Sequence, residues 1–380
     1  MSSMRFDYES FACGSKSKLY RYIHKPHTTN TTLIRTDDSS LEKVTFNRFV
    51  IHENDGKPVL FLSSLIEFGC ESLLPHYFLD DFKRTYSQFH TIAITWSGRK
   101  CLYQNHMDEI WELDDNFQYL RDMSLAFHAI GKNIGNIEKS LLKYGKVLQS
   151  KFIANKFLET YCFSCGHFFP SQYCAEKCER CSSTNLKQSM ICNPEAHKIN
   201  YSPLKLNLDK YKHMLNCFKK DQKYIGIFAR HRKTYGRNLP KSFYIDLIEK
   251  LKRKNYEVVW LGEKQNTLEC PSTVSFDLTK SEFANDVAAC VAMVSKCHAT
   301  FQAWTASTRF SMWAERPFFL VESRDQVNGK GHEGKRIKLL DNNKVFNKIF
   351  VYNYYDANIE LKKFTDYTTS HFLDFIEKIN

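Results

Sequence analysis

Tyr224-Ile-Gly-Ile-Phe-Ala229 is the stretch that decides the fold. It is too short and too rich in β-forming residues for a helix, so a buried strand is predicted. The next residues, Arg230-His-Arg-Lys-Thr-Tyr-Gly-Arg237, form a basic loop at the carboxyl end of that strand. Apolar residues then recur at helical spacing over 243–251, between Pro240, which suits a first helical turn, and Asn255, which suits a left-handed end.

The same alternation continues to residue 321. Further strands are predicted at Val258-Val-Trp-Leu261, which ends in Gly262-Glu263, at Ala299-Thr-Phe-Gln302 and, after Pro317, at Phe318-Phe-Leu-Val321. Helical spacing marks 283–294, and the hydroxyl-rich Trp304-Thr-Ala-Ser-Thr308 opens another helix. Alternating strands and helices predict an α/β domain around a parallel sheet.

Polar residues follow three of these predicted strands. In an open parallel sheet, ligands bind outside the carboxyl ends of the strands, where loops expose unpaired N–H groups. Here the three ends carry Arg and Lys, a glutamate, and Thr and Ser. Guanidinium groups and hydroxyls suit phosphate oxygens, and a carboxylate suits ribose hydroxyls, so the pattern predicts a nucleotide-diphosphate site.

The first half of the chain shows a second, shorter series of the same kind. Strands are predicted at 59–62, 91–95 and 108–113, and a helix over 73–89. The first of these strands is the second member of a predicted hairpin that begins at residue 46. Residues 117–160 are mostly helical in pattern, Leu148 included. We therefore expect a first α/β domain.

Four cysteines form the most specific local motif. Two Cys-x-x-Cys pairs, Cys162 with Cys165 and Cys178 with Cys181, are separated by twelve residues. This spacing presents four thiolates to zinc in a tetrahedral site with no open position for a water molecule. The motif predicts a zinc ribbon that serves as a structural staple or as a docking module, and it argues against catalysis by the metal.

Composition bounds the class of protein. Hydrophobic residues make up 43% of the 380 residues, which argues against disorder, and no apolar run is long enough to span a membrane. Thirteen cysteines, an odd number, do not suit a disulfide framework, so we expect a soluble cytoplasmic protein. The net charge is +12, and residues 219–254 hold twelve Lys or Arg against three Asp or Glu. Anionic ligands, or an anionic surface such as that of a membrane, are the expected partners. The alternative is that the basic residues over 250–254 only form a solvent-exposed face of a helix.

These motifs resemble those of GT-B glycosyltransferases, most closely the bacterial heptosyltransferase-like family. The resemblance covers most of 58–113 and 224–321. It is carried by five motifs, namely Phe68-Gly-Cys-Glu-Ser-Leu-Leu-Pro75, Tyr103 with Asp108-Glu-Ile110, Arg237 three residues before Pro240, Gly262-Glu263, and Trp304-Thr305-Ala306 with Arg309 and Pro317. The chain departs from the family pattern at Trp304, Ala306 and Arg309, where the family favours Asp, Gly and His.

The resemblance implies a role for several residues. Arg237 would bind the donor diphosphate, Glu263 the ribose and Thr305 the distal phosphate, with Ser307, Thr308 and Arg309 beside it. The family's base is an acid in the first glycine loop, and Glu71 is the nearest one here, displaced by one position because Cys70 takes the expected place. From the charge of the loop we add Arg230, Arg232 and Lys233 as further phosphate ligands.

The resulting hypothesis is a glycosyltransferase of two Rossmann-like domains facing a cleft, with a small zinc-ribbon insertion. It would move a sugar from a nucleotide-sugar donor to a hydroxyl of a glycan, a lipid-linked sugar or a nucleic acid, without a catalytic metal. Two alternatives stay open, a zinc-ribbon nucleic-acid-binding protein on an α/β scaffold and a nucleotide-sugar epimerase. The predicted parts are a polar arm over 1–43, the first domain over 44–160, the ribbon over 161–195, the second domain over 196–362 and a closing helix over 363–380.

Overall fold

The structure is a computed structural model, and it divides into two compact units, Met1–Ile199 and Asn200–Asn380, which we describe one at a time. The residues it describes are 56–66, 68–72, 74–113, 132–142, 144–150, 153, 158–162, 164–165, 168–170, 177–178, 180–190, 204, 206–231, 238–303, 306–323, 347–352 and 361–379. The predicted hairpin member over 46–52 and the amino-terminal arm lie outside them.

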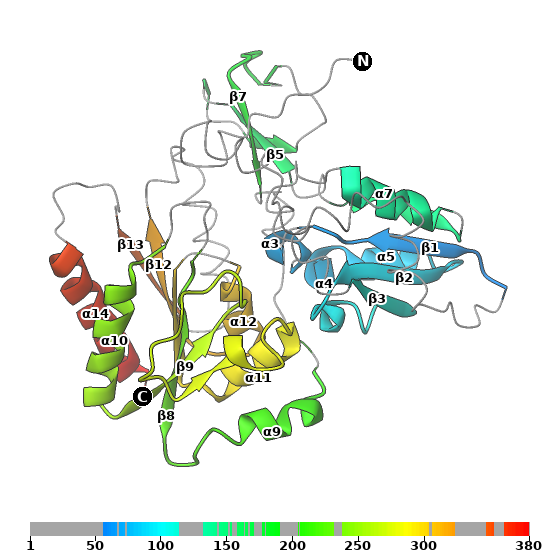
Figure 1. The fold of residues 1–380 in the computed structure, drawn as a ribbon. Helices are drawn as coiled ribbons and strands as arrows, with labels where there is room; N and C mark the ends of the chain where they lie inside the picture. The colour runs from blue at the N-terminus through cyan, green and yellow to red at the C-terminus, as the bar shows by residue number, and fades with distance from the viewer. Residues whose placement is uncertain are drawn as a thin grey trace. The chain divides into compact units, whose positions relative to one another are not determined.

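Unit 1 is built on a four-stranded parallel sheet (Figure 1). Its strands are β1 (Val59–Ser63), β2 (His90–Trp96), β3 (Glu109–Leu113) and β4 (Lys146–Leu148), in the order β3-β2-β1-β4. The first three confirm the predicted strands. The fourth corrects the prediction, because Leu148 lies in a strand and not in a helix. With only three residues, β4 has no alternation to read, and its pairing with β1 decides its conformation.

The helices of unit 1 are short. They are α3 (Phe68–Glu71), α4 (Leu74–Tyr77), α5 (Leu79–Thr85), the 3-10 turn η2 (Lys100–Leu102) and α7 (Lys132–Leu141). The helix expected over 73–89 is therefore broken at Phe78 and ends at residue 85. Buried isoleucines and a leucine of α7 pack onto apolar side chains of β1 and β2, and these residues form the core of the unit.

Unit 2 contains a six-stranded parallel sheet in the order β10-β9-β8-β11-β12-β13. Its strands are β8 (Lys223–Phe228), β9 (Tyr256–Leu261), β10 (Phe276–Asp277), β11 (Ala299–Ala303), β12 (Phe318–Ser323) and β13 (Asn347–Tyr352). Numbered from its own first strand, this is the doubly wound order 3-2-1-4-5-6 of Rossmann-like folds. The prediction of α/β architecture is confirmed, and the strands missed are β10 and β13.

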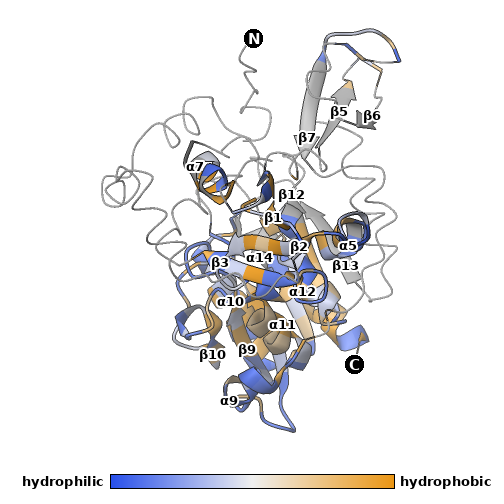
Figure 2. Ribbon diagram, turned by 90° about the vertical axis from the view of Figure 1, so that its right-hand side faces the viewer, coloured by the Kyte–Doolittle hydropathy of each residue, from blue (hydrophilic) through white to orange (hydrophobic). Residues whose placement is uncertain are grey.

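Helices cover both faces of this sheet. α10 (Lys241–Arg253) and α14 (Leu361–Lys378) lie side by side on one face, and α11 (Val287–Lys296) and α12 (Thr308–Trp313) lie on the other (Figure 1). The short α9 (Lys212–Leu215), η6 (Asp209–Tyr211) and η7 (Leu278–Lys280) complete the unit. α11 is largely hydrophobic, in keeping with its buried position (Figure 2). Asn255 adopts the left-handed conformation expected of it, with a φ of 62°.

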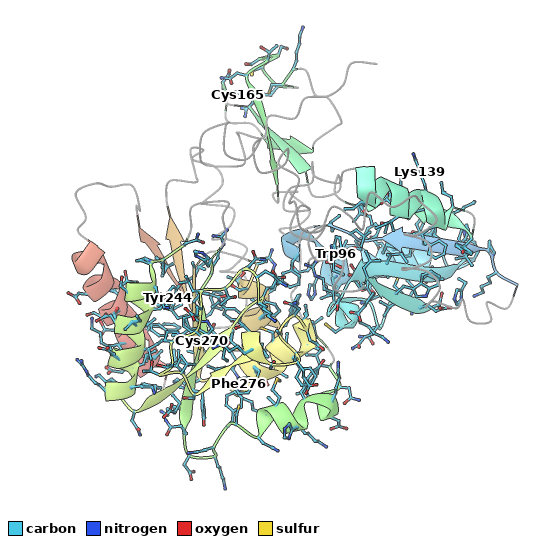
Figure 3. All side chains as sticks on the ribbon, in the orientation of Figure 1. Trp96, Lys139, Cys165, Tyr244, Cys270 and Phe276 are labelled. Carbon is cyan, nitrogen blue, oxygen red and sulfur yellow. The ribbon has the colours of Figure 1, made fainter. Side chains whose placement is uncertain are left out.

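Aromatic side chains fill both interiors, as Trp96 in unit 1 and Tyr244 in unit 2 illustrate (Figure 3). The basic end of α10 is paired within its own unit. Lys250 forms ion pairs with Asp246 and with Asp366 of α14, and Lys254 pairs with Glu377 of the same helix. These pairs join the two helices over the apolar contact beneath them.

The cysteine motif belongs to a separate antiparallel sheet of three strands, with Cys162 at the end of one strand and the other three cysteines outside the strands. These are β5 (Leu158–Cys162), β6 (Phe168–Pro170) and β7 (Leu186–Met190), in the order β6-β5-β7. No helix among the described residues is both long and apolar enough to cross a membrane.

Candidate functional site

Each parallel sheet has one point where the strand order reverses, and this topological switch point is where ligands bind in such folds. In unit 2 it lies between β8 and β11, which are neighbours in the sheet. In unit 1 it lies between β1 and β4. The residues at the carboxyl ends of these strands are therefore the candidate site residues of each unit.

Arg230 follows β8 at the switch point of unit 2. Its side chain is mostly buried, and Nη1 donates a hydrogen bond of 2.7 Å to Oδ1 of Asn238. Its backbone forms an isolated antiparallel bridge with Thr267. The guanidinium group is thus held against a neutral amide at the end of the strand.

Glu263 follows the next strand, β9, in a loop with a defined shape. Gly262 has a φ of 134°, and a Cβ at this position would lie 2.2 Å from Oγ1 of Thr267. The Thr267 hydroxyl donates to the Glu263 carbonyl at 2.7 Å, and Nδ2 of Asn266 donates to Oε2 of Glu263 at 2.8 Å. The loop therefore requires glycine at position 262, and it orients the Glu263 carboxylate.

The polar turn after β11 is tied to the strand that precedes it. Ser307 donates to Oε1 of Gln302 at 2.8 Å, and both residues are buried. The next residue, Thr308, is fully buried and accepts a hydrogen bond of 3.3 Å from Nη1 of the half-buried Arg309. Gln302 was not predicted as a site residue, although a buried amide at a strand end is visible in the sequence as the polar residue that closes an apolar run.

The structure thus places five predicted donor residues after three adjacent strands of one sheet. Arg230 follows β8, Glu263 follows β9, and Ser307, Thr308 and Arg309 follow β11. Four others, Arg232, Lys233, Arg237 and Thr305, lie outside the described residues.

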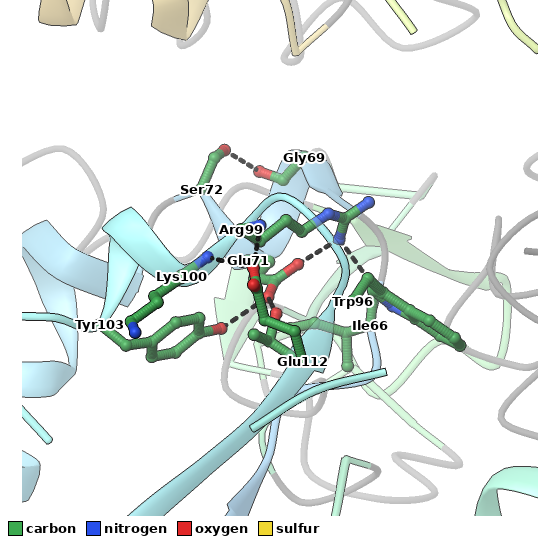
Figure 4. A network of polar contacts seen from close by, with 10 residues as sticks. Ile66, Gly69, Glu71, Ser72, Trp96, Arg99, Lys100, Tyr103 and Glu112 are labelled. Atoms are coloured by element: carbon green, nitrogen blue, oxygen red, sulfur yellow. Dashed lines mark hydrogen bonds and ion pairs between the residues drawn. The ribbon is translucent and has the colours of Figure 1, made fainter. Parts of the chain in front are cut away.

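Glu71, the predicted base in unit 1, sits in a buried polar network (Figure 4). Its carboxylate accepts hydrogen bonds from Thr95 and from the Tyr103 hydroxyl, the latter at 2.7 Å, and it forms an ion pair with the buried Arg99. Burial, together with the charge of Glu71, raises the pKa of Tyr103 well above its usual value, so the phenol remains protonated and donates. The carboxylate of Glu71 is therefore engaged inside the unit, and its role as a base stays a prediction.

Arg99 is in turn held by the loop that carries Glu71. Its Nη1 also lies 3.4 Å from the carbonyl oxygen of Ile66, and the guanidinium group stacks over the ring of Phe68 at 5.1 Å. The backbone N–H of Arg99 donates to Oε1 of Glu112 at 2.9 Å. These contacts fix the glycine loop against the turn after β2.

A second buried carboxylate in unit 1 was missed from the sequence. Glu138 lies on the buried face of α7 with Ile134, Ile137 and Leu141, and only 3% of it is exposed. Its Oε1 accepts a hydrogen bond of 2.6 Å from the backbone N–H of Ser150. Burial raises its pKa, and the hydrogen bond from the Ser150 backbone opposes the rise. The signal in the sequence is an acid within an apolar helical stripe, where packing alone favours leucine.

The four predicted metal ligands come together in the ribbon. The sulfur atoms of Cys162, Cys165, Cys178 and Cys181 all lie within 4.8 Å of one another. Zinc–sulfur bonds of about 2.3 Å in a tetrahedron place the sulfurs about 3.8 Å apart, so the cluster has the size that zinc requires. Ser182, with a φ of 58°, turns the chain after the second pair, and its N–H donates to the Cys178 carbonyl at 2.8 Å.

Comparison with known proteins gives structural neighbours only. No protein-family model and no curated protein sequence matches the chain. A glycosyl transferase family 9 protein from Veillonella parvula is 9% identical with a TM-score of 0.45, over 85% of this chain and 97% of that one. The E. coli ADP-heptose LPS heptosyltransferase II is 11% identical with a TM-score of 0.41, over 83% and 99%. A UDP-GlcNAc 2-epimerase from Neisseria meningitidis is 11% identical with a TM-score of 0.40, over 84% and 93%.

The chain is similar to these proteins. At such identities function has to be argued from the residues of this chain.

Proposed function

We propose that the protein is a glycosyltransferase that moves a sugar from a nucleotide-sugar donor to an acceptor hydroxyl, and that unit 2 binds the donor. One observation carries the proposal. The switch point between β8 and β11 is flanked by Arg230 on one side and by Ser307 and Thr308 on the other, and Glu263 follows the adjacent strand β9. A cation, two hydroxyls and a carboxylate in this order suit a diphosphate and a ribose.

The chemistry assigned to these groups follows from the charge of the leaving group. When the sugar departs, the nucleoside diphosphate takes the electrons of the broken bond, and fixed cations and hydrogen-bond donors stabilise that charge. Arg230 supplies one such cation, and we assign Arg232, Lys233 and Arg237 of the same loop, Thr305, and Arg309 to the same task. Glu263 would hold the ribose hydroxyls. With cations in this role, the transfer needs no catalytic metal.

We assign zinc to the four cysteines as a structural ion. Four thiolates fill the coordination sphere and leave no position for a reacting water molecule or phosphate. The ribbon is then held by the metal, since the buried apolar groups described within it are the cysteines themselves. Reduced thiols of this kind are in keeping with a cytoplasmic protein.

Ligand-dependent thermal stability tests the donor site. The parent would be screened with UDP-glucose, UDP-GlcNAc, GDP-mannose and ADP-glucose, and a ligand at about 100 times its Kd stabilises the fold by about 2.7 kcal/mol. Arg230→Gln should lose most of this shift. Lys254→Ala is the matched control, because Lys254 is an exposed cation of the same unit that is paired with Glu377. An equal shift in Arg230→Gln and the parent would show that the donor site is misplaced.

The same samples separate the two alternatives. A nucleic-acid grip by the basic segment predicts RNA or DNA affinity that falls steeply between low and physiological salt. The ion pairs of Lys250 and Lys254 weigh against this reading, because they neutralise part of that segment within the unit. An epimerase would convert the nucleotide sugar into an isomer without an acceptor, which product analysis detects.

A further inference from the structure

Four buried polar side chains join β11 to α12 in unit 2, next to the switch point. Thr300 and Gln302 are two residues apart on the strand, so their side chains point to the same face of the sheet. Ser307 and Ser311 are four residues apart, at the start of α12 and within it, so they lie on the same side of the helix. None of the four residues is more than 9% exposed.

These side chains form two short hydrogen bonds between the strand and the helix. In the inner hydrogen bond, the hydroxyl oxygens of Thr300 and Ser311 lie 2.7 Å apart. In the outer hydrogen bond, the Ser307 hydroxyl donates to Oε1 of Gln302 at 2.8 Å. Nε2 of Gln302 also donates to the Ser311 hydroxyl oxygen at 3.4 Å, so the amide group is held at both of its ends. The outer hydrogen bond is the one nearer to the carboxyl end of the strand.

Gln302 occupies a position where packing alone favours an apolar residue. β11 lies between β8 and β12, and the residues that pair with Gln302 on these strands are Phe228 and Leu320. A buried amide is unfavourable unless its polar atoms are hydrogen-bonded. The strand therefore carries a polar group that its own stability does not require, which is the pattern expected of a functional position.

The outer hydrogen bond ties the turn after β11 to the strand. Ser307 is the N-cap residue of α12, where a serine hydroxyl commonly accepts a hydrogen bond from a backbone N–H of the first helical turn. The Ser307 side chain makes no such cap bond. Its hydroxyl is directed to Gln302 instead, so this bond fixes the position of the turn relative to the sheet.

The turn leaves the sheet at the level of Arg230. Gln302 pairs with Phe228, which is the last residue of β8, and Arg230 comes two residues later. Among the described residues of the turn, Ala306 and Arg309 are partly exposed. These two residues are the parts of the turn that a ligand at the switch point can reach.

We propose that Gln302 is a positioning residue of the donor site, and that it acts through Ser307 to hold the turn that presents Arg309 to the donor diphosphate. The inference rests on the proposed function, because it takes unit 2 as the donor-binding unit. Gln302 itself does not touch the ligand in this scheme. The inner hydrogen bond has a separate task, which is to join α12 to the sheet.

The test measures the affinity for a nucleoside diphosphate and for the corresponding monophosphate by calorimetry, with the base of whichever sugar nucleotide of the panel stabilises the parent most. Gln302→Met removes the acceptor of the Ser307 hydroxyl and keeps an unbranched side chain. Loss of one such hydrogen bond should weaken diphosphate binding by about tenfold. The monophosphate should bind as it does to the parent, because the turn is assigned to the distal phosphate.

A second variant breaks the same hydrogen bond from the other side. Ser307→Ala should weaken diphosphate binding as Gln302→Met does. The double variant should bind the diphosphate no more weakly than the weaker single variant, because two changes that remove one interaction are not additive. Additive losses would show that Gln302 does not act through Ser307, and the inference would be wrong.

Thr300→Val is the matched control, because it removes the inner hydrogen bond by replacing a buried hydroxyl with a methyl group. It should lower the midpoint of urea unfolding about as much as Ser307→Ala does, and it should bind both nucleotides as the parent does. Equal weakening of diphosphate binding by Thr300→Val and Gln302→Met would show that both bonds only hold α12 in place. A Gln302→Met variant that loses affinity for both nucleotides to the same extent would contradict the inference as well.

Failure of the inference can be told apart from failure of the proposed function. If Arg230→Gln weakens diphosphate binding while Gln302→Met and Ser307→Ala bind as the parent does, the inference is wrong and the proposed donor site stands. If the parent binds no nucleotide of the panel, the proposed function fails and the inference fails with it.

Discussion

The two parallel sheets of this chain begin with the same strand order and differ in what they place at the switch point. In unit 2, Arg230 follows β8, and Ser307 and Thr308 follow β11. The loop after β9 requires glycine at position 262, where φ is positive. In unit 1 the ends of β1 and β4 carry serines backed by a buried acid, and the arginine nearby is already paired with a second acid.

The contrast shows that one topology can carry different polar groups. In unit 1 the Arg99 guanidinium group contacts a buried carboxylate, whereas in unit 2 the Arg230 guanidinium group donates to the amide oxygen of Asn238. We expect an anionic ligand at unit 2, in keeping with the proposed donor site. The predictions below test this contrast, from the largest expected effect to the smallest.

Metal removal tests whether the two sheets are independent of the ribbon. Structural zinc contributes on the order of 10–16 kcal/mol of apparent binding free energy in small zinc domains, so a chelator should unfold β5, β6 and β7. The purified protein should contain about one zinc per chain by elemental analysis. Hydrogen exchange should then show loss of protection in the ribbon alone, and the thermal shift by nucleotide sugars should persist. Loss of that shift in a protein whose sheets stay protected would assign the metal to donor binding and contradict a purely structural role.

Arg99→Met tests whether the charge in unit 1 is used internally. The change leaves the Glu71 carboxylate buried without its cation, and breaking such a pair costs about 3–5 kcal/mol of unfolding free energy. Urea unfolding measures the loss. Arg84→Met is the control, since the Arg84 side chain is 80% exposed in its pair with Asp81 and should cost less than about 1 kcal/mol. Similar losses in the two variants would remove the contrast between the units.

Gly262→Ala tests the shaped loop of unit 2. A side chain at a φ of 134° is strained, and its Cβ meets the Thr267 hydroxyl. The variant should therefore lose about 1–3 kcal/mol of unfolding free energy. It should also lose the thermal shift that nucleotide sugars produce in the parent. Gly135→Ala in α7 is the matched control, because a Cβ there meets nothing within 4 Å. It should be neutral or stabilise by up to about 1 kcal/mol. The idea of a preshaped loop is wrong if Gly262→Ala binds the donor as the parent does.

Glu138→Gln gives the smallest effect on stability, and its sign depends on pH. Because burial raises the pKa of Glu138 in the folded state, that state binds more protons than the unfolded chain between the two pKa values. The unfolding free energy of the parent therefore falls as pH rises from the unfolded value, about 4.3, through the raised folded value. The variant lacks this dependence and should become the more stable protein toward neutral pH. Denaturant curves at pH 4, 6 and 8 measure the difference, and a variant less stable at pH 8 than at pH 4, relative to the parent, contradicts it.

Much of the fold was predictable because its strands are buried runs with clear boundaries. Glycine, proline and basic residues delimit 224–229 and 258–261, and the structure confirms both as strands to within a few residues. β4, β10 and β13 were missed for a different reason. β4 and β10 are only three and two residues long, and β4 is a strand because Leu148 pairs with Leu62, a contact 86 positions apart that no local pattern reports.

The candidate sites were predictable only in part. The thiol cluster follows from spacing, because four cysteines in two short turns need few other contacts to meet. Glu138 was overlooked because only the apolar members of its helix were used to recognise the helix. Its contact with Ser150 depends on the strand order that places Ser63 next to Ser150, and sheet order depends on packing over the whole unit. The same order brings Arg230 and Ser307 to neighbouring strand ends.

The position of α14 has a consequence for synthesis of the chain. Phe372 and Phe375 pack against Phe319 and belong to the same core as Ile225 of β8. A ribosome makes roughly 5–20 residues per second, so β8 waits on the order of ten seconds before α14 leaves the exit tunnel. Unit 1 can complete its own core during that time, while the apolar face of the second sheet is still uncovered. A nascent chain paused before residue 361 should therefore engage chaperones through unit 2 alone.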